Sequence, residues 1–254
     1  MYLRGLMKLS LRAITLIVFL LAAAATASAD GLTLTLNNGG NDVMGGVYVG
    51  PYNFTGTTSG GQTMSLQLVC DDFQDEVYPG ESWSATTTPM PVTSTTGLKF
   101  NGSGDSTGYQ EIAWLVQQMF KTTNATTIGQ IQWAIWDIFD SGISNNDPYG
   151  TISQGNQCAI NGLYNSGAPG NTASSCGGTY ATTNWVQQAI NAVTGPGSGN
   201  LNFSGLTIYT PSGTPDPAKD GPPQEYFGVP EPGTLLLLGA GLFSLVGLRR
   251  RLSY

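Results

Sequence analysis

An apolar run near each end of this 254-residue chain restricts the folded domain to the polar residues between the two runs. At the N-terminal end, three basic residues precede the apolar run 13–25, and an Ala-Ser-Ala sequence that ends at Ala29 follows it. A basic, an apolar and a small-residue region in this order are typical of a cleavable signal peptide. We therefore predict a signal peptide over residues 1–29, starting at Met1 or Met7, with a permanent N-terminal anchor as the alternative.

The central body, residues 30–228, is long enough for a single domain with a buried core. The chain has no arginine between Arg12 and Arg249 and no histidine anywhere, and its net charge is −7. A phosphate-binding surface needs clustered Lys and Arg, so we expect no nucleic acid partner. The absence of histidine excludes His-based catalytic triads and His metal ligands.

Apolar periodicity predicts an α+β fold for residues 30–209. Alternation with period two predicts strands early and late in the body, at 32–36, 43–52, 64–70, 75–78, 82–88 and 201–209. Helical spacing predicts three helices, at 110–121, 128–140 and 183–193, the second with Thr126 or Thr127 as its N-cap. We expect one domain in which a sheet or small barrel packs against the helical part.

The C-terminal end has its own pattern. Pro-rich residues 210–228 predict an extended spacer. Pro230, Glu231 and Pro232 follow, then an apolar run over 235–248 and a basic cluster of Arg249, Arg250 and Arg251. Residues 229–254 resemble the PEP-CTERM sorting signal of Gram-negative bacteria. The resemblance implies export, transient anchoring in the inner membrane, processing by an exosortase, and a place at the cell surface or outside the cell with exopolysaccharide. The alternative is a membrane anchor that is never cut.

The three cysteines have different surroundings. Cys158 and Cys176 flank a loop rich in Gly, Asn and Ser, and thiols of exported proteins tend to pair, so we predict a disulfide between them. That pairing leaves Cys70 as an odd cysteine. Cys70 ends the predicted strand 64–70, on the same face as Leu66 and Leu68, and we expect it to point inward.

Gln132 lies in the middle of the apolar stripe of the second predicted helix, which consists of Ile128, Ile131, Ile135 and Phe139. A buried amide without hydrogen-bond partners is destabilising by about 1–3 kcal/mol. The position of Gln132 therefore predicts a specific partner inside the core.

Three segments that include these residues, 66–71, 112–115 and 132–136, resemble the thioester domains of bacterial surface adhesins. The resemblance implies that the Cys70 sulfur attacks the side-chain carbonyl of Gln132 and expels ammonia. The resulting internal thioester would then bond covalently to an amine or hydroxyl on a target surface. The alternatives are a buried inert Cys70 with Gln132 as a hydrogen-bonding core residue, and an intermolecular disulfide through Cys70.

Two classes of function follow. The first is an adhesin or matrix protein of the cell surface that uses a Cys70–Gln132 thioester, and the second is a noncovalent structural matrix protein. We expect no enzyme activity, cofactor or metal site. The acidic residues are interpreted as solvated surface rather than as Ca²⁺ ligands; they are Asp71, Asp72, Asp75 and Glu76, Asp137 and Asp140 on the outer face of their helix, and the loop 140–147.

Overall fold

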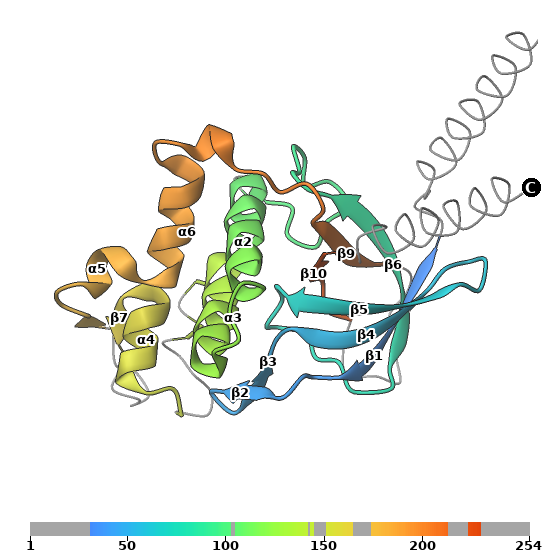
Figure 1. The fold of residues 1–254 in the computed structure, drawn as a ribbon, viewed down its shortest axis with the longest axis horizontal. Coiled ribbons are helices and arrows are strands. Elements are labelled where there is room, and N and C mark those ends of the chain that lie inside the picture. Colours follow the sequence, from blue (N-terminus) through green and yellow to red (C-terminus); the bar gives the residue numbers. More distant parts are fainter. Residues whose placement is uncertain are drawn as a thin grey trace, which may run out of the picture.

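A six-stranded barrel and a layer of helices lie side by side in the molecule (Figure 1). The structure is a computed structural model that describes residues 31–102, 105–141, 143–144, 151–164, 174–212 and 223–229. The predicted signal peptide and the apolar run of the predicted sorting tail lie outside these residues.

The barrel closes in the order β1-β4-β5-β10-β9-β6, and all neighbouring strands are antiparallel. Closure leaves no unpaired sheet edge. Its strands are β1 (Leu32–Asn38), β4 (Tyr52–Thr57), β5 (Thr63–Cys70), β6 (Ser82–Pro89), β9 (Thr207–Ser212) and β10 (Tyr226–Gly228).

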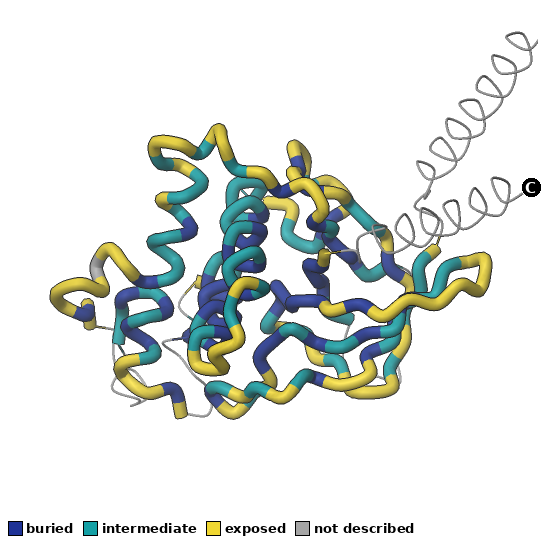
Figure 2. Tube along the Cα trace, viewed as in Figure 1, coloured by how far each residue is buried: buried dark blue, intermediate teal, exposed yellow. Residues whose placement is uncertain are grey.

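Successive residues of the barrel strands serve two different cores, because side chains alternate across a strand. Cys70 and Tyr226 belong to the cluster that fills the barrel, together with Leu34, Leu36, Phe54, Leu66 and Leu68. Their neighbours Val69 and Phe227 belong to the larger cluster that includes the helices. Figure 2 shows the buried stretches concentrated where the helices meet the strands.

The helical layer is built around α3 (Ala125–Phe139), which contacts α2, α4, α6 and β5. Nine consecutive or near-consecutive positions of α3 are buried, so this helix is apolar on almost every side rather than along one stripe. Its N-cap is Asn124, whose side chain accepts the Thr127 N–H at 2.9 Å, and not the predicted Thr126 or Thr127. The other helices are α2 (Asp105–Met119), α4 (Gln154–Asn161), α5 (Tyr180–Thr183), α6 (Trp185–Thr194) and the 3-10 turn η1 (Ser198–Asn200).

Two short hairpins complete the described elements. β2 (Asp42–Met44) pairs with β3 (Val47–Val49), and α3 contacts both strands of this hairpin. β7 (Leu163–Tyr164) pairs with β8 (Ser174–Ser175) beside α4. The predicted disulfide is confirmed: Cys158 of α4 is bonded to Cys176, directly after β8.

The predicted α+β class and barrel are confirmed, but several elements differ. In the part of the chain that the structure describes, four helices have eight or more residues instead of about three, because α4 is too polar to show a helical stripe. The predicted strand 43–52 is the hairpin β2–β3 followed by the start of β4. Residues 75–78 form no strand, because the Asp72 carboxylate accepts the N–H of Gln74 at 3.0 Å and bends the chain.

The predicted Pro-rich spacer, residues 210–228, is wrong for its two ends. β9 continues to Ser212, and Tyr226–Gly228 form the fully buried strand β10, which completes the barrel between β5 and β9. Within the described residues, no helix combines the length and the apolar character that crossing a membrane requires.

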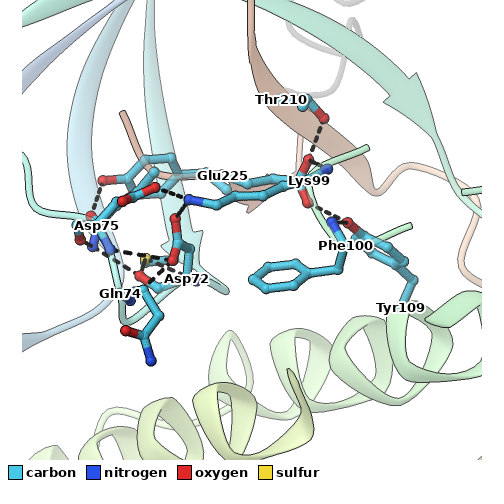
Figure 3. A network of polar contacts seen from close by, with 11 residues as sticks. Asp72, Gln74, Asp75, Lys99, Phe100, Tyr109, Thr210 and Glu225 are labelled. Carbon is cyan, nitrogen blue, oxygen red and sulfur yellow. Dashed lines mark hydrogen bonds and ion pairs between the residues drawn. The ribbon is translucent and has the colours of Figure 1, made fainter. Parts of the chain in front are cut away.

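Glu225, directly before β10, connects the barrel to the helices (Figure 3). Its carboxylate is fully buried and accepts the Tyr109 O–H of α2 at 2.5 Å, the Lys99 N–H at 3.1 Å and the hydroxyl of Thr210 in β9. Tyr109 also accepts the Phe100 N–H at 3.1 Å. Burying a carboxylate is tolerable only when such donors replace water, so these residues fix α2 against the barrel.

Tyr109→Phe removes a donor from the buried Glu225 and an acceptor from Phe100. We expect the free energy of unfolding to fall by about 2 kcal/mol, because a buried charged group loses a hydrogen bond. Urea denaturation measures this change. Tyr78→Phe is the matched control, since the half-exposed Tyr78 hydroxyl also donates to a glutamate, Glu76, at 2.6 Å. Equal losses in the two variants would contradict the connecting role of Tyr109.

Candidate functional site

Cys70 lies at the end of β5, where the strand leaves the barrel and meets the helical layer. It is the free cysteine of the described residues and has no exposed surface. Its Sγ donates to the Asp72 carbonyl oxygen at 2.9 Å and accepts the Asp72 N–H at 3.3 Å. A sulfur without exposed surface does not reach a second chain, so the burial of Cys70 argues against an intermolecular disulfide.

Gln132 approaches the same strand end from the middle of α3. Its Nε2 donates to the main-chain oxygen of Cys70 at 2.7 Å, and its Oε1 accepts the Gly50 N–H at 3.2 Å. The side chain has no exposed surface, as predicted for a residue in the apolar stripe. The structure therefore brings together two residues that are 62 positions apart in the sequence.

Gly50 is a member of the site that the sequence did not reveal. A Cβ atom at this position would lie 2.9 Å from the Oε1 of Gln132 and 3.1 Å from the Tyr52 ring. Contacts below 3.0 Å require a shift of one partner, so residue 50 has to lack a side chain for the amide to reach the main chain. The signal in the sequence was only a glycine before a proline, which is typical of many turns.

The surroundings of Cys70 favour the neutral thiol over the thiolate. Burial raises the pKa of Cys70 well above its ordinary value, and the negative charge of Asp72 raises it further. The Asp72 N–H and the indole N–H of Trp136 act in the opposite direction. A neutral thiol agrees with Cys70 as an inert residue of the core. It also agrees with Cys70 as a nucleophile that loses its proton only when it attacks Gln132.

Asp71 is buried next to Cys70, and the interpretation of this residue as solvated surface is wrong. It is 1% exposed, and its side-chain oxygens accept no hydrogen bond from the described residues. Burial raises the pKa of Asp71 well above the ordinary value, and the nearby Glu225 carboxylate raises it further. Both effects oppose a negative charge on Asp71 and favour its neutral, protonated form.

Two further acidic residues are buried rather than solvated. Asp72 is fully buried and forms an ion pair with Lys99, which also reaches Asp75 (Figure 3). Asp137 faces inward, where its carboxylate accepts the Ser144 N–H at 2.9 Å and the Asn161 amide at 2.7 Å. Burial raises the pKa of Asp137 to about 6 despite these hydrogen bonds. Within the described residues, no group of Cys, Asp and Glu has the arrangement of a metal site.

An open pocket of about 630 Å³ lies near the candidate site, although neither Cys70 nor Gln132 lines it. Tyr52 and Trp136 belong to its lining. Tyr52 packs in the same core cluster as Cys70, and Trp136 follows Gln132 by about one turn of α3. The rest of the lining includes the exposed rings of Tyr48 and Tyr78, the acidic Asp75 and Glu76, and the amide of Gln224, and it contains no basic residue.

Comparisons with known proteins bear on the C-terminal end alone. Residues 228–251 match the family model of the PEP-CTERM protein-sorting motif, a range that contains Pro230 to Pro232 and Arg249 to Arg251. The match confirms the predicted signal and indicates an exported protein that an exosortase processes after transient membrane anchoring. No curated protein and no solved structure matches the chain. The resemblance of the body to thioester domains thus receives no support from these comparisons and stays a prediction.

Asp71→Asn tests the neutral carboxyl beside Cys70. An acid whose pKa is raised by folding stabilises the fold fully below its unfolded pKa of about 3.9, and this contribution is lost as the pH rises toward the folded pKa. Asparagine is neutral at every pH, so the variant should gain stability relative to wild type by about 1.4 kcal/mol per pH unit in this window.

The measurement is urea denaturation at about pH 4 and about pH 8, the lower value lying near the unfolded pKa. Asp42→Asn, in the hairpin β2–β3, is the control and should leave the pH dependence of wild type unchanged. A stability difference between wild type and Asp71→Asn that is the same at both pH values would contradict a neutral Asp71.

Proposed function

We propose that this protein is a surface or matrix protein whose domain carries an internal thioester between Cys70 and Gln132, through which it bonds covalently to a target. The observation that carries the proposal is the contact of the Gln132 amide with the main chain of Cys70, at 2.7 Å. An inward glutamine and a free, buried cysteine meet at one strand end, although nothing in a noncovalent core requires that pairing.

The chemistry needs only these two side chains. The Cys70 thiol loses its proton and its sulfur attacks the Cδ carbon of Gln132, so that the C–S bond forms. The C–N bond then breaks, and Nε2 leaves as ammonia with the proton that the thiol released. This is nucleophilic acyl transfer with a single use. The N–H of Gly50, which already donates to Oε1, is in position to stabilise the negative charge that develops on this oxygen.

The second half of the reaction joins the protein to its target. An amine or hydroxyl attacks Cδ, the C–S bond breaks, and Cys70 regains its proton. In this proposal the attacking group approaches from the pocket that Tyr52 and Trp136 line. The sorting motif supports a location in the envelope or outside the cell, where adhesion or association with exopolysaccharide uses such a bond.

A noncovalent matrix protein is the second candidate. The observation that favours it is the complete hydrogen bonding of the Gln132 amide, with Gly50 as donor and the Cys70 carbonyl as acceptor. A glutamine whose amide is hydrogen-bonded at both its oxygen and its nitrogen is also stable as an ordinary residue of the core.

Intact mass of the purified mature domain separates the two candidates. With a thioester, wild type is lighter than its sequence mass by one ammonia, and methylamine adds covalently to give a product heavier than the sequence mass by one methylene group. Cys70→Ala and Gln132→Met should each have the full mass of their own sequences and ignore methylamine. Gln130→Met on the same helix is the matched control and should keep the mass deficit. Wild type with its full sequence mass and no methylamine adduct leaves only the noncovalent candidate.

A further inference from the structure

The indole N–H of Trp136 is a buried polar group that the packing of the core does not use. The residue is 3% exposed, and its indole Nε1 forms no hydrogen bond with any described residue. Buried donors are nearly always paired, and an unpaired one is destabilising by about 1–3 kcal/mol. We therefore expect the Trp136 N–H to find a hydrogen-bond acceptor in another state of the site.

The helix places Trp136 on the face of α3 from which Gln132 reaches Cys70. Trp136 follows Gln132 by four positions, so both side chains lie on the same face of α3. The Trp136 ring is held by edge contacts with Phe73 at 5.0 Å and Trp133 at 5.1 Å between ring centroids. The indole N–H is close enough to Cys70 to favour the thiolate, although it does not reach hydrogen-bond geometry with the sulfur.

We propose that the indole N–H of Trp136 is the donor that stabilises the Cys70 sulfur as it carries negative charge during formation and opening of the thioester. The inference rests on the proposed function. When an amine attacks Cδ of Gln132, the electron pair of the breaking C–S bond moves to Sγ, and the proton of the attacking nitrogen finally neutralises it. In between, the Asp72 N–H donates to Sγ, as it already does at 3.3 Å, and the Trp136 N–H supplies the second hydrogen bond.

The second donor is needed because the site disfavours a negative charge on the sulfur. The sulfur leaves into a dry environment with the Asp72 carboxylate nearby, and both burial and this charge oppose a negative charge on it. A donor that is held close to the site of developing charge lowers the barrier with little reorganisation. The Asp72 N–H is such a donor at 3.3 Å, and the unpaired Trp136 N–H becomes the second when the sulfur carries charge.

Trp136→Phe keeps the aromatic packing and removes the N–H alone. We expect the variant to form the thioester, seen as the ammonia deficit in intact mass, but to react with methylamine about tenfold more slowly than wild type, because one hydrogen bond to a charged group is lost in the transition state. Trp133→Phe is the matched control. Trp133 is equally buried on the same helix, but its N–H donates to the Met44 carbonyl at 3.1 Å, and this variant should react at the wild-type rate.

A second readout does not need the thioester. In a Gln132→Met background Cys70 stays a free thiol, and the pH profile of its alkylation by iodoacetamide reports the pKa of the thiol. Adding Trp136→Phe should move this profile to higher pH, whereas adding Trp133→Phe should not. Asp71, Asp72, Tyr52 and Tyr226, the titratable groups that act on Cys70, are present in all three proteins.

The outcomes separate the two proposals. Aminolysis of Trp136→Phe at the wild-type rate together with an unshifted alkylation profile overturns the role of Trp136 and leaves the thioester intact. Wild type without an ammonia deficit overturns the thioester and, with it, any part of Trp136 in acyl transfer. The alkylation profile then still decides whether the indole binds the sulfur.

Discussion

The hydrogen bond from the Gln132 amide to the main chain of Cys70 is the contact on which the candidate site depends. It joins the central helix α3 to the end of β5, and the Gly50 N–H completes it from a third segment. The barrel, the β2–β3 hairpin and the helical layer therefore meet at this one amide. Because it is fully buried, its position is set by the packing of all three parts and not by the local sequence alone.

The place where α3, the end of β5 and Gly50 meet is also unusually polar for a protein core. Asp72, two residues after Cys70, and Glu225 are both buried. Lys99 pairs with Asp72, and the main-chain N–H of Lys99 and the hydroxyls of Tyr109 and Thr210 donate to Glu225. Such networks are stable only when their groups are satisfied, and they hold the surrounding chain in one arrangement. A rigid setting of this kind suits a reaction between two protein groups that has to occur once and at one place.

Part of the site and of the barrel could be predicted from the sequence, and the rest could not, for physical reasons. Period-two alternation before Cys70 and the helical stripe around Gln132 placed both side chains inward, because these patterns depend on local geometry. The burial of Asp71 and Asp137 was missed, because the packing that covers Asp71 and the donors to Asp137, Ser144 and Asn161, come from elsewhere in the chain. β10 was assigned to a spacer, because three buried residues after a Pro-rich stretch carry no strand pattern until β5 and β9 pair with them.

In the thioester, the side-chain carbonyl of Gln132 is an acyl carbon bound to sulfur rather than an amide carbon. Carbon-13 NMR of mature protein with labelled glutamine side chains distinguishes the two carbons, with Gln132→Met to assign the signal. We expect wild type to have one glutamine carbonyl resonance in the thioester range, Gln132→Met to lack it, and Cys70→Ala to return it to the amide range. A wild-type spectrum with every glutamine carbonyl in the amide range, together with a Cys70 thiol that is titrated after unfolding, would contradict the thioester.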